Sequence, residues 1–176
     1  MRHFGHWIWI FVLLIGPVPG RAEYIGWQEA VARLAAERTR AGTCARLLKR
    51  HGDEATISRG ELVYGNAKAE IDAVVAGLVV ALAKDQEPSS LPDLEARLKR
   101  GVSGREKFCM QITPLVPDTS GEKNLIIDLM GEVLGPMIEA VQTIYLDHRE
   151  EDRLTRRTIQ TQLEATAWPA FSAITP

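Results

Sequence analysis

Apolar residues recur every three or four positions through most of the chain beyond residue 22. This spacing is typical of amphipathic α-helices. Strictly alternating apolar and polar residues, and clusters of β-branched or aromatic residues, are the marks of strands, and both are scarce here. The pattern therefore predicts an all-α protein.

The first predicted helix covers residues 27–50. Its apolar residues lie close to one stripe at i, i+3 and i+4 spacing, and they are Trp27, Val31, Leu34, Ala41, Ala45 and Leu48. His51 and Gly52 end it, because a cation and a flexible residue are favoured at a helix C-terminus.

The second predicted helix starts between residues 53 and 60 and ends near Lys84. Residues 73–83 are almost entirely apolar, which predicts a buried central helix. This run is shorter than the roughly 18 apolar residues that a membrane-spanning helix requires. Small residues predict a close approach of neighbouring helices, and these are Gly65, Ala69, Ala73, Ala76 and Gly77.

The third predicted helix begins after Ser90, where a cap is followed by Pro92 and Asp93 in the first turn. Pro114 and Pro117 end it. Its apolar stripe consists of Leu91, Leu94, Leu98, Val102, Cys109, Ile112 and Val116.

The last predicted helix opens with Thr119 and Glu122 as a capping box and runs to about Ala167. Pro136 removes a helical hydrogen bond, so a kink or break is expected near it. Short connections make consecutive helices antiparallel neighbours. The predicted fold is an antiparallel up-down four-helix bundle with a long, kinked C-terminal helix.

The first 22 residues have the pattern of a signal peptide. Arg2 gives the positive start, residues 7–15 form an unbroken apolar run, and Gly20 and Ala22 supply the small residues of a cleavage site. A membrane anchor is the competing interpretation, but the apolar run falls short of the roughly 20 residues that a spanning helix needs.

Cleavage after residue 22 leaves residues 23–176, a length typical of a single domain. We therefore expect a periplasmic or secreted helical-bundle protein with no stable membrane anchor.

Cys44 and Cys109 are the two cysteines of the chain, and an exported protein meets an oxidising environment. Both lie toward the C-terminal ends of predicted helices that run in the same direction in an up-down bundle. We predict a disulfide between them. The alternative is a pair of buried thiols that act as small hydrophobic residues.

The net charge of the chain is −2, and loss of Arg2 and Arg21 with the leader makes the mature protein more acidic. A nucleic-acid-binding domain would show a strongly basic face. The charge also gives no attraction to an anionic membrane surface. Neither class of partner is expected.

No arrangement of residues predicts catalysis or cofactor binding. A metal site at Asp147, His148, Glu151 and Asp152 has suitable helical spacing, but neighbouring arginines favour a solvated, internally paired stretch. The haem-attachment signature, the phosphate-binding loop and the serine nucleophile motif are absent. We assign no catalytic, cofactor-binding or metal-binding residue, and an enzyme using His148 is the weakest alternative.

Three aromatic residues, Trp27, Trp168 and Phe171, lie near the ends of the predicted bundle. They favour packing anchors, although exposed aromatic side chains also mark interaction surfaces.

The sequence favours a noncatalytic exported helical protein that binds another protein, in the manner of an inhibitor, an immunity-type protein or a chaperone. The alternative is a carrier that holds an apolar small molecule or cofactor between its helices, where bundles place such sites. The small residues of the second helix, together with Met130 and Met137, are its support.

Overall fold

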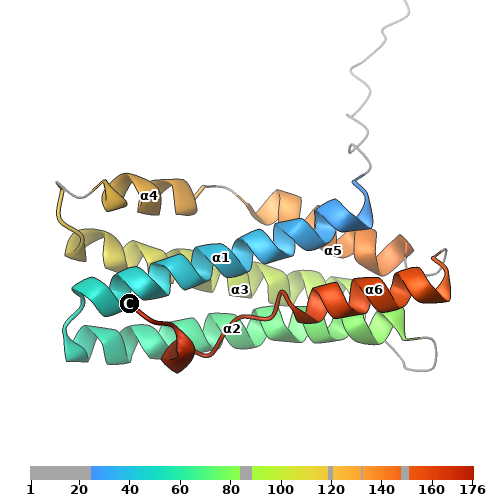
Figure 1. Ribbon diagram of the computed structural model, residues 1–176, viewed down its shortest axis with the longest axis horizontal. Coiled ribbons are helices and arrows are strands. Elements are labelled where there is room, and N and C mark those ends of the chain that lie inside the picture. Colours follow the sequence, from blue (N-terminus) through green and yellow to red (C-terminus); the bar gives the residue numbers. More distant parts are fainter. Residues whose placement is uncertain (1–24, 84–88, 119–120, 132, 148–150) are drawn as a thin grey trace, which may run out of the picture.

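The computed structural model describes residues 25–83, 89–118, 121–131, 133–147 and 151–176. These residues form helices and short turns, and they contain no strand (Figure 1). The predicted all-α class is therefore confirmed for the described part of the chain. The predicted signal peptide, residues 1–22, lies outside it.

Six α-helices and two short 3₁₀ helices make up the described structure. They are α1 (Trp27–His51), α2 (Glu54–Leu82), α3 (Leu91–Ile112), η1 (Thr113–Leu115), α4 (Glu122–Leu129), α5 (Leu134–Asp147), α6 (Arg153–Glu164) and η2 (Phe171–Ala173). In Figure 1, α1, α3 and α6 run from right to left, while α2, α4 and α5 run from left to right.

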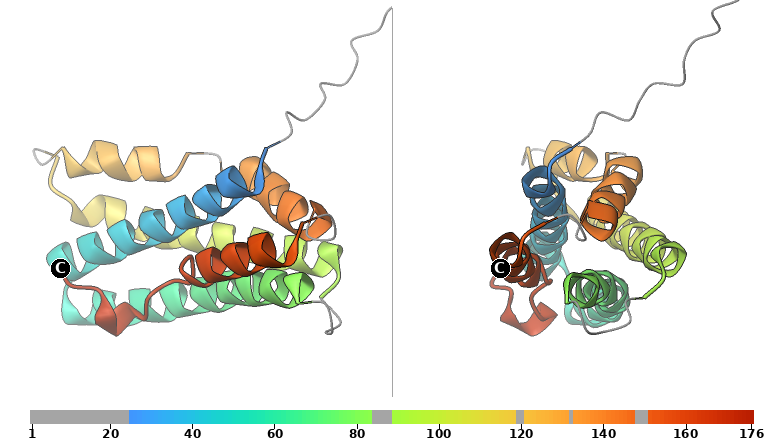
Figure 2. Two further views of the ribbon diagram at one scale, coloured as in Figure 1. Left: turned by 45° about the vertical axis from the view of Figure 1, so that its right-hand side comes forward. Right: turned by 90° about the vertical axis from the view of Figure 1, so that its right-hand side faces the viewer.

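The helices surround a common core. Seen end-on, α1, α5, α3, α2 and α6 follow one another around it (Figure 2), and each neighbouring pair is in contact. Beyond the end of α6, the C-terminal tail, residues 165–176, continues along α1 and α2. Buried apolar side chains from all six α-helices and the tail form one cluster.

The C-terminal half differs from the single long helix that the sequence predicts. It forms three helices: α4 ends at Leu129 and α5 begins at Leu134, and α5 ends at Asp147 while α6 begins at Arg153. Pro136 lies in the first turn of α5, where its missing N–H removes no helical hydrogen bond. The proline therefore begins a helix instead of bending one, and the described residues do not form the long, kinked C-terminal helix that the sequence predicts.

The start of α4 also differs from the predicted capping box. Thr119 lies outside the described residues, and Gly121 at the N-cap, with φ of 42°, makes no side-chain cap. Glu122 is the first residue of α4, and its carboxylate accepts from Arg50 Nη1 at 2.5 Å and lies 2.9 Å from His51 Nε2. These contacts lower the pKa of Glu122, the His51 hydrogen bond most of all. They attach α4 to the C-terminus of α1.

The caps of α2 and α3 follow the sequence closely. The Asp53 carboxylate accepts from the Thr56 N–H at 2.7 Å, and the Ser90 hydroxyl accepts from the Asp93 N–H at 3.3 Å. Side-chain caps of this kind satisfy N–H groups that have no partner within the helix.

The small residues of α2 only partly act as predicted. Gly77 is a close-packing position, since an added Cβ would lie 2.4 Å from Leu94 Cδ2. By contrast, Gly65, Ala69 and Ala76 are exposed, and an added Cβ at Gly65 would meet nothing within 4 Å. The prediction of close helix approach at these three positions is therefore wrong, because they fall on the outer face of α2.

The predicted disulfide between Cys44 and Cys109 is present, with a Cα–Cα distance of 5.4 Å. Both residues are fully buried, and they join α1 to α3 within the core. The bridge closes a sequence separation of 65 residues.

Loss of this bridge should destabilise the protein by about 4 kcal/mol, the chain-entropy value for a loop of that length. In thermal unfolding, Cys44→Ala should lower Tm by about 10 °C. A reductant should lower the Tm of the wild-type protein by a similar amount and leave that of Cys44→Ala unchanged. An unchanged Tm in both treatments would contradict the role of the bridge.

Candidate interaction surface

Two of the three aromatic residues singled out in the sequence pack around one tyrosine. The Tyr64 ring centroid lies 5.4 Å from that of Trp168, 5.5 Å from Phe171 and 5.6 Å from Phe108. The Tyr64 hydroxyl donates to the Pro169 carbonyl at 3.0 Å. This cluster fastens the C-terminal tail to α2 and α3.

Further contacts of the tail involve α1 and α2. Lys49 Nζ donates to the Ile174 carbonyl at 2.6 Å and lies 4.8 Å from the centre of the Phe171 ring. The Trp168 backbone N–H donates to the Asp72 carboxylate at 3.2 Å. The tail is therefore held by hydrogen bonds as well as by its aromatic side chains.

These contacts favour the packing-anchor interpretation of Trp168 and Phe171 over the alternative of an exposed interaction surface. Trp168 and Phe171 are buried, so they act as packing anchors and offer no exposed face to a partner. Trp27 is partly buried and packs against the core. Aromatic residues near the end of a chain often mark a surface, but here the tail folds back over the bundle.

The stretch weighed as a metal site has a structural role where it is described. The Asp152 carboxylate caps α6 by accepting from the Leu154 and Thr155 N–H groups. His148 lies outside the described residues. Within the described ranges, no group of three or more His, Cys, Asp or Glu side chains is arranged to hold a metal ion.

One charged pair lies inside the core. Glu37 of α1 and Arg105 of α3 are both fully buried, and Arg105 Nε donates to Glu37 Oε1 at 2.8 Å. Arg105 Nη1 also donates to the Leu129 carbonyl at 2.7 Å, at the end of α4. A group that no solvent reaches cannot touch a substrate, so we assign this pair a structural role.

An apolar opening lies between α2 and α3. The two helices approach closely at small residues, because a Cβ added at Gly101 would lie 2.6 Å from Ile71 Cδ1 and one at Gly104 would lie 3.0 Å from Ala67 Cβ. This approach leaves a groove along the outer side of the pair, the α2–α3 groove. It has an apolar part and a charged part that share Val63.

The apolar part of the α2–α3 groove measures about 540 Å³. It is lined by Thr56, Arg59, Leu62, Val63, Gln111 and Leu115. Leu62 is 68% exposed and lines this apolar part of the groove. Arg59 donates to the Thr56 hydroxyl at 3.2 Å, and, after the hydrogen bonds of Thr56, its charge contributes to lowering the pKa of Asp53.

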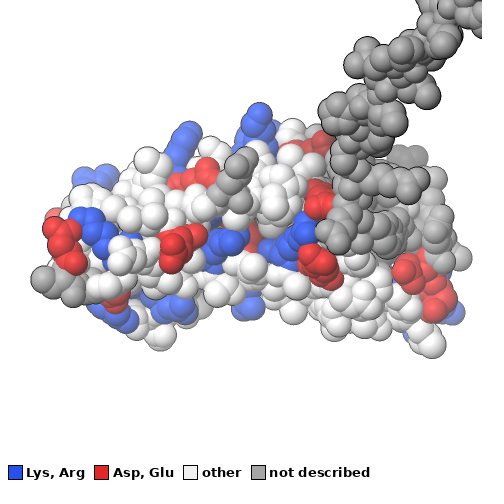
Figure 3. Space-filling model, turned by 90° about the horizontal axis from the view of Figure 1, so that it is seen from above, with Lys and Arg blue, Asp and Glu red and all other residues white. Residues whose placement is uncertain are grey.

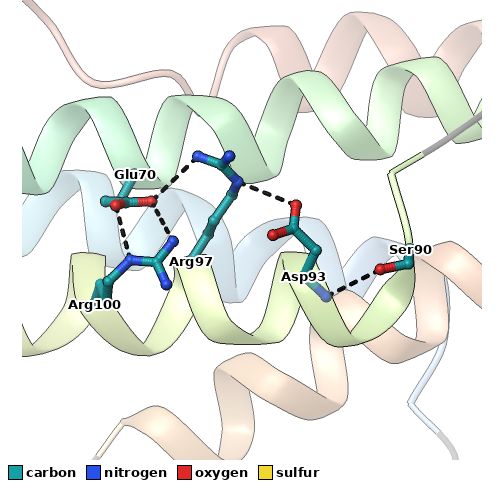
Figure 4. Close-up of polar contacts among 5 residues, drawn as sticks. All are labelled: Glu70, Ser90, Asp93, Arg97 and Arg100. Atoms are coloured by element: carbon teal, nitrogen blue, oxygen red, sulfur yellow. Dashed lines mark hydrogen bonds and ion pairs between the residues drawn. The ribbon is translucent and has the colours of Figure 1, made fainter.

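The charged part measures about 410 Å³ and contains Glu70 and Arg100. Glu70 accepts from Arg100 at 2.8 and 3.1 Å and from Arg97 at 3.4 Å (Figure 4). Arg97 in turn donates to Asp93 at 3.2 Å. The Arg100 hydrogen bond lowers the pKa of Glu70 below its usual range. Two acids and two arginines therefore balance each other along this part of the groove.

The face of the molecule seen from above has no large patch of a single charge sign among its described residues (Figure 3). Figure 3 shows lysines and arginines interspersed with aspartates and glutamates over α1, α4 and α5. In the described ranges, no helix is both long enough and apolar enough to cross a membrane.

Comparisons with protein-family models, curated proteins and solved structures returned no match.

The groove residues were not among the site residues that the sequence suggested. The sequence pattern does not show which faces of these helices are covered by other helices. The position of Leu62 and Leu115 in one groove therefore depends on the packing of α2 against α3. A signal for the buried pair was present, because Glu37 lies between Leu34 and Ala41 on the core stripe of α1, and Arg105 lies between Val102 and Cys109 on that of α3.

Tyr64 should make stability depend on alkaline pH. Burial, and then the Asp72 carboxylate, raise its pKa to about 12. In the unfolded chain it titrates near 10, so the stability that its neutral form contributes is present below about pH 10 and is lost as the pH rises toward 12. Tyr64→Phe should be about 1 kcal/mol less stable than wild type near pH 8, because a hydrogen bond is lost.

In urea unfolding, the difference in unfolding free energy between Tyr64→Phe and the wild-type protein should fall to zero near pH 11. A constant difference between about pH 8 and pH 11 would show that the Tyr64 hydroxyl is not held in its neutral form.

The Glu37–Arg105 pair should behave as a buried pair that tolerates joint replacement. Glu37→Leu leaves the Arg105 charge buried without its carboxylate, and this should cost about 3–5 kcal/mol in urea unfolding. Glu37→Leu combined with Arg105→Met should recover most of that loss. If the two substitutions instead destabilise additively, the pair does not interact as described.

Proposed function

We propose that this chain is an exported, noncatalytic helical protein that binds another protein, in the periplasm or outside the cell, through the α2–α3 groove. The observation that carries the proposal is the exposed Leu62 beside an open apolar groove of about 540 Å³. Large apolar residues that line an open groove and are flanked by polar groups are typical of binding surfaces. The predicted signal peptide supports the location.

The chemistry of the groove defines the kind of segment it would accept. Leu62, Val63 and Leu115 form an apolar floor, and Arg59 lies at its side with its guanidinium group on the Thr56 hydroxyl. The charged part is internally balanced by Glu70 and Arg100 and so attracts neither sign strongly. The matching occupant is an amphipathic helix of a partner protein, with an apolar side chain on the floor and an acidic side chain at Arg59.

A partner of this kind suits an inhibitor, an immunity-type protein or a chaperone, since each works by covering a segment of another protein. The disulfide and the buried tail support the same role, because a pre-organised groove binds with a smaller loss of conformational entropy.

Site-specific photo-crosslinking in the producing cell tests the proposal. A photoreactive phenylalanine analogue is placed at Leu62 in one strain and at Leu154 in another. Leu154 is a matched control, because it is 74% exposed on α6 and Leu62 is 68% exposed on α2. We expect a discrete protein adduct from position 62 in the periplasm or medium and none from position 154.

Leu62→Asp should abolish that complex while Leu154→Asp leaves it intact, with both variants keeping the wild-type Tm within about 2 °C. The adduct should map to a helical segment in which an acidic residue lies three or four positions from an apolar one. Equal adducts from both positions, or a protein retained in the cytoplasm, would contradict the proposal.

The carrier alternative has a distinct outcome in the same preparations. An apolar small molecule in an organic extract of the gently isolated protein, with no adduct at position 62, would favour a carrier. Met137, one of the residues that suggested such a site, is fully buried in the core cluster.

A further inference from the structure

A second opening lies between α1 and the C-terminal tail, away from the α2–α3 groove. It measures about 340 Å³ and shares no lining residue with the groove. The tail contributes Pro169 and residues 173–175, and α1 contributes Arg38, Thr39, Gly42 and Arg46. We call this opening the α1–tail pocket.

The pocket is positively charged. Arg38 and Arg46 are both exposed, and no acidic residue lines the opening. On α1, the positions three and four residues from either arginine hold Leu34, Ala35, Ala41, Gly42, Thr43, Lys49 and Arg50, so no neighbouring turn supplies a carboxylate. The lining of the pocket therefore carries two positive side chains and no acidic one.

Several arginines elsewhere in the structure are paired with carboxylates. Arg33 pairs with Glu29 and Glu139, and Arg100 pairs with Glu70. Arg46, in contrast, donates only to the Thr43 hydroxyl at 2.8 Å, and neither Arg38 nor Arg46 lies within ion-pair distance of a described carboxylate.

The helix geometry lets both guanidinium groups reach one ligand. Arg38, Gly42 and Arg46 are spaced four residues apart and lie on the same side of α1, each about 6 Å from the next along the axis. A Cβ added at Gly42 would meet nothing within 4 Å, so the space between the two arginines is open. A ligand over Gly42 would have one arginine on each side.

The opposite wall is fixed in place. Lys49 Nζ holds the Ile174 carbonyl at 2.6 Å, and Trp168 and Phe171 are buried on either side of the wall residue Pro169. A pocket with a fixed wall and two planar, permanently charged donors suits a rigid anionic group, because guanidinium groups bind oxyanions through two parallel hydrogen bonds.

We propose that the α1–tail pocket binds a small organic anion through its phosphoryl or carboxylate groups, held between Arg38 and Arg46 over Gly42. The pocket has room for more than the anionic group itself, which is why an organic anion is the expected class. This site is independent of the α2–α3 groove and of the protein partner proposed above.

Isothermal titration calorimetry of the purified protein at constant ionic strength tests the site, with sodium phosphate in one series and sodium citrate in the other. We expect saturable binding of at least one probe with a Kd of about 1 mM or tighter. Phosphate alone would indicate a phosphoryl ligand, and citrate alone a carboxylate ligand, and either outcome supports the site.

Substitutions locate the binding. Arg38→Gln and Arg46→Gln should each weaken binding by about tenfold or more, since each removes a charge-assisted interaction. Gly42→Glu should abolish it, because a carboxylate would then occupy the space between the arginines.

Two variants serve as matched controls. Arg59→Gln removes an arginine that, like Arg46, donates to a threonine hydroxyl three residues earlier, but it lies in the α2–α3 groove. Gly65→Glu adds a carboxylate at an exposed helical glycine where a Cβ also meets nothing within 4 Å. Both should bind the probe as wild type does.

The proposal is overturned if neither probe gives saturable heat, or if the two control variants weaken binding as much as the pocket variants. Loss of the crosslink at Leu62 with anion binding intact would instead overturn only the proposed protein-binding function, so the two failures are distinguishable.

Discussion

The pairing of α1 with α3 is the constraint on which the rest of the structure depends. The Glu37–Arg105 ion pair and the Cys44–Cys109 disulfide join the two helices at neighbouring levels along their axes. All four residues are fully buried. A buried ion pair tolerates little displacement, because its partners lose their compensation when they separate. Arg105 also bonds to the Leu129 carbonyl and so positions the end of α4.

With α1 and α3 joined, α2 packs against both, and the C-terminal tail closes the remaining side. Tyr64 contacts the tail in two ways. Its hydroxyl donates to the Pro169 carbonyl, and its ring packs against those of Trp168 and Phe171. Both openings of functional interest follow from this arrangement. The close approach of α2 and α3 at Gly101 and Gly104 leaves the α2–α3 groove, and the returning tail forms the far wall of the α1–tail pocket.

Charge pairing differs between arginines that join neighbouring helices and those that line the α1–tail pocket. Most arginines that contact a neighbouring helix have a carboxylate partner, as Arg33 and Arg100 do. Arg38 and Arg46 make no ion pair with a described carboxylate, and both line the α1–tail pocket. An uncompensated arginine beside an open cavity can gain a strong interaction from an anionic ligand, whereas a paired one would have to lose an existing bond first.

The sequence by itself determined the helical class, the positions of α1, α2 and α3 to within a few residues, and the Cys44–Cys109 bridge. These features depend on local periodicity, on caps such as Ser90, and on two cysteines whose helix positions place them at one height. Only the tertiary structure decided that the C-terminal half forms three helices, that Trp168 and Phe171 are buried, and that Leu62, Arg38 and Arg46 face openings. A helical pattern fixes which residues share a face, but what covers that face depends on contacts between segments far apart in the chain.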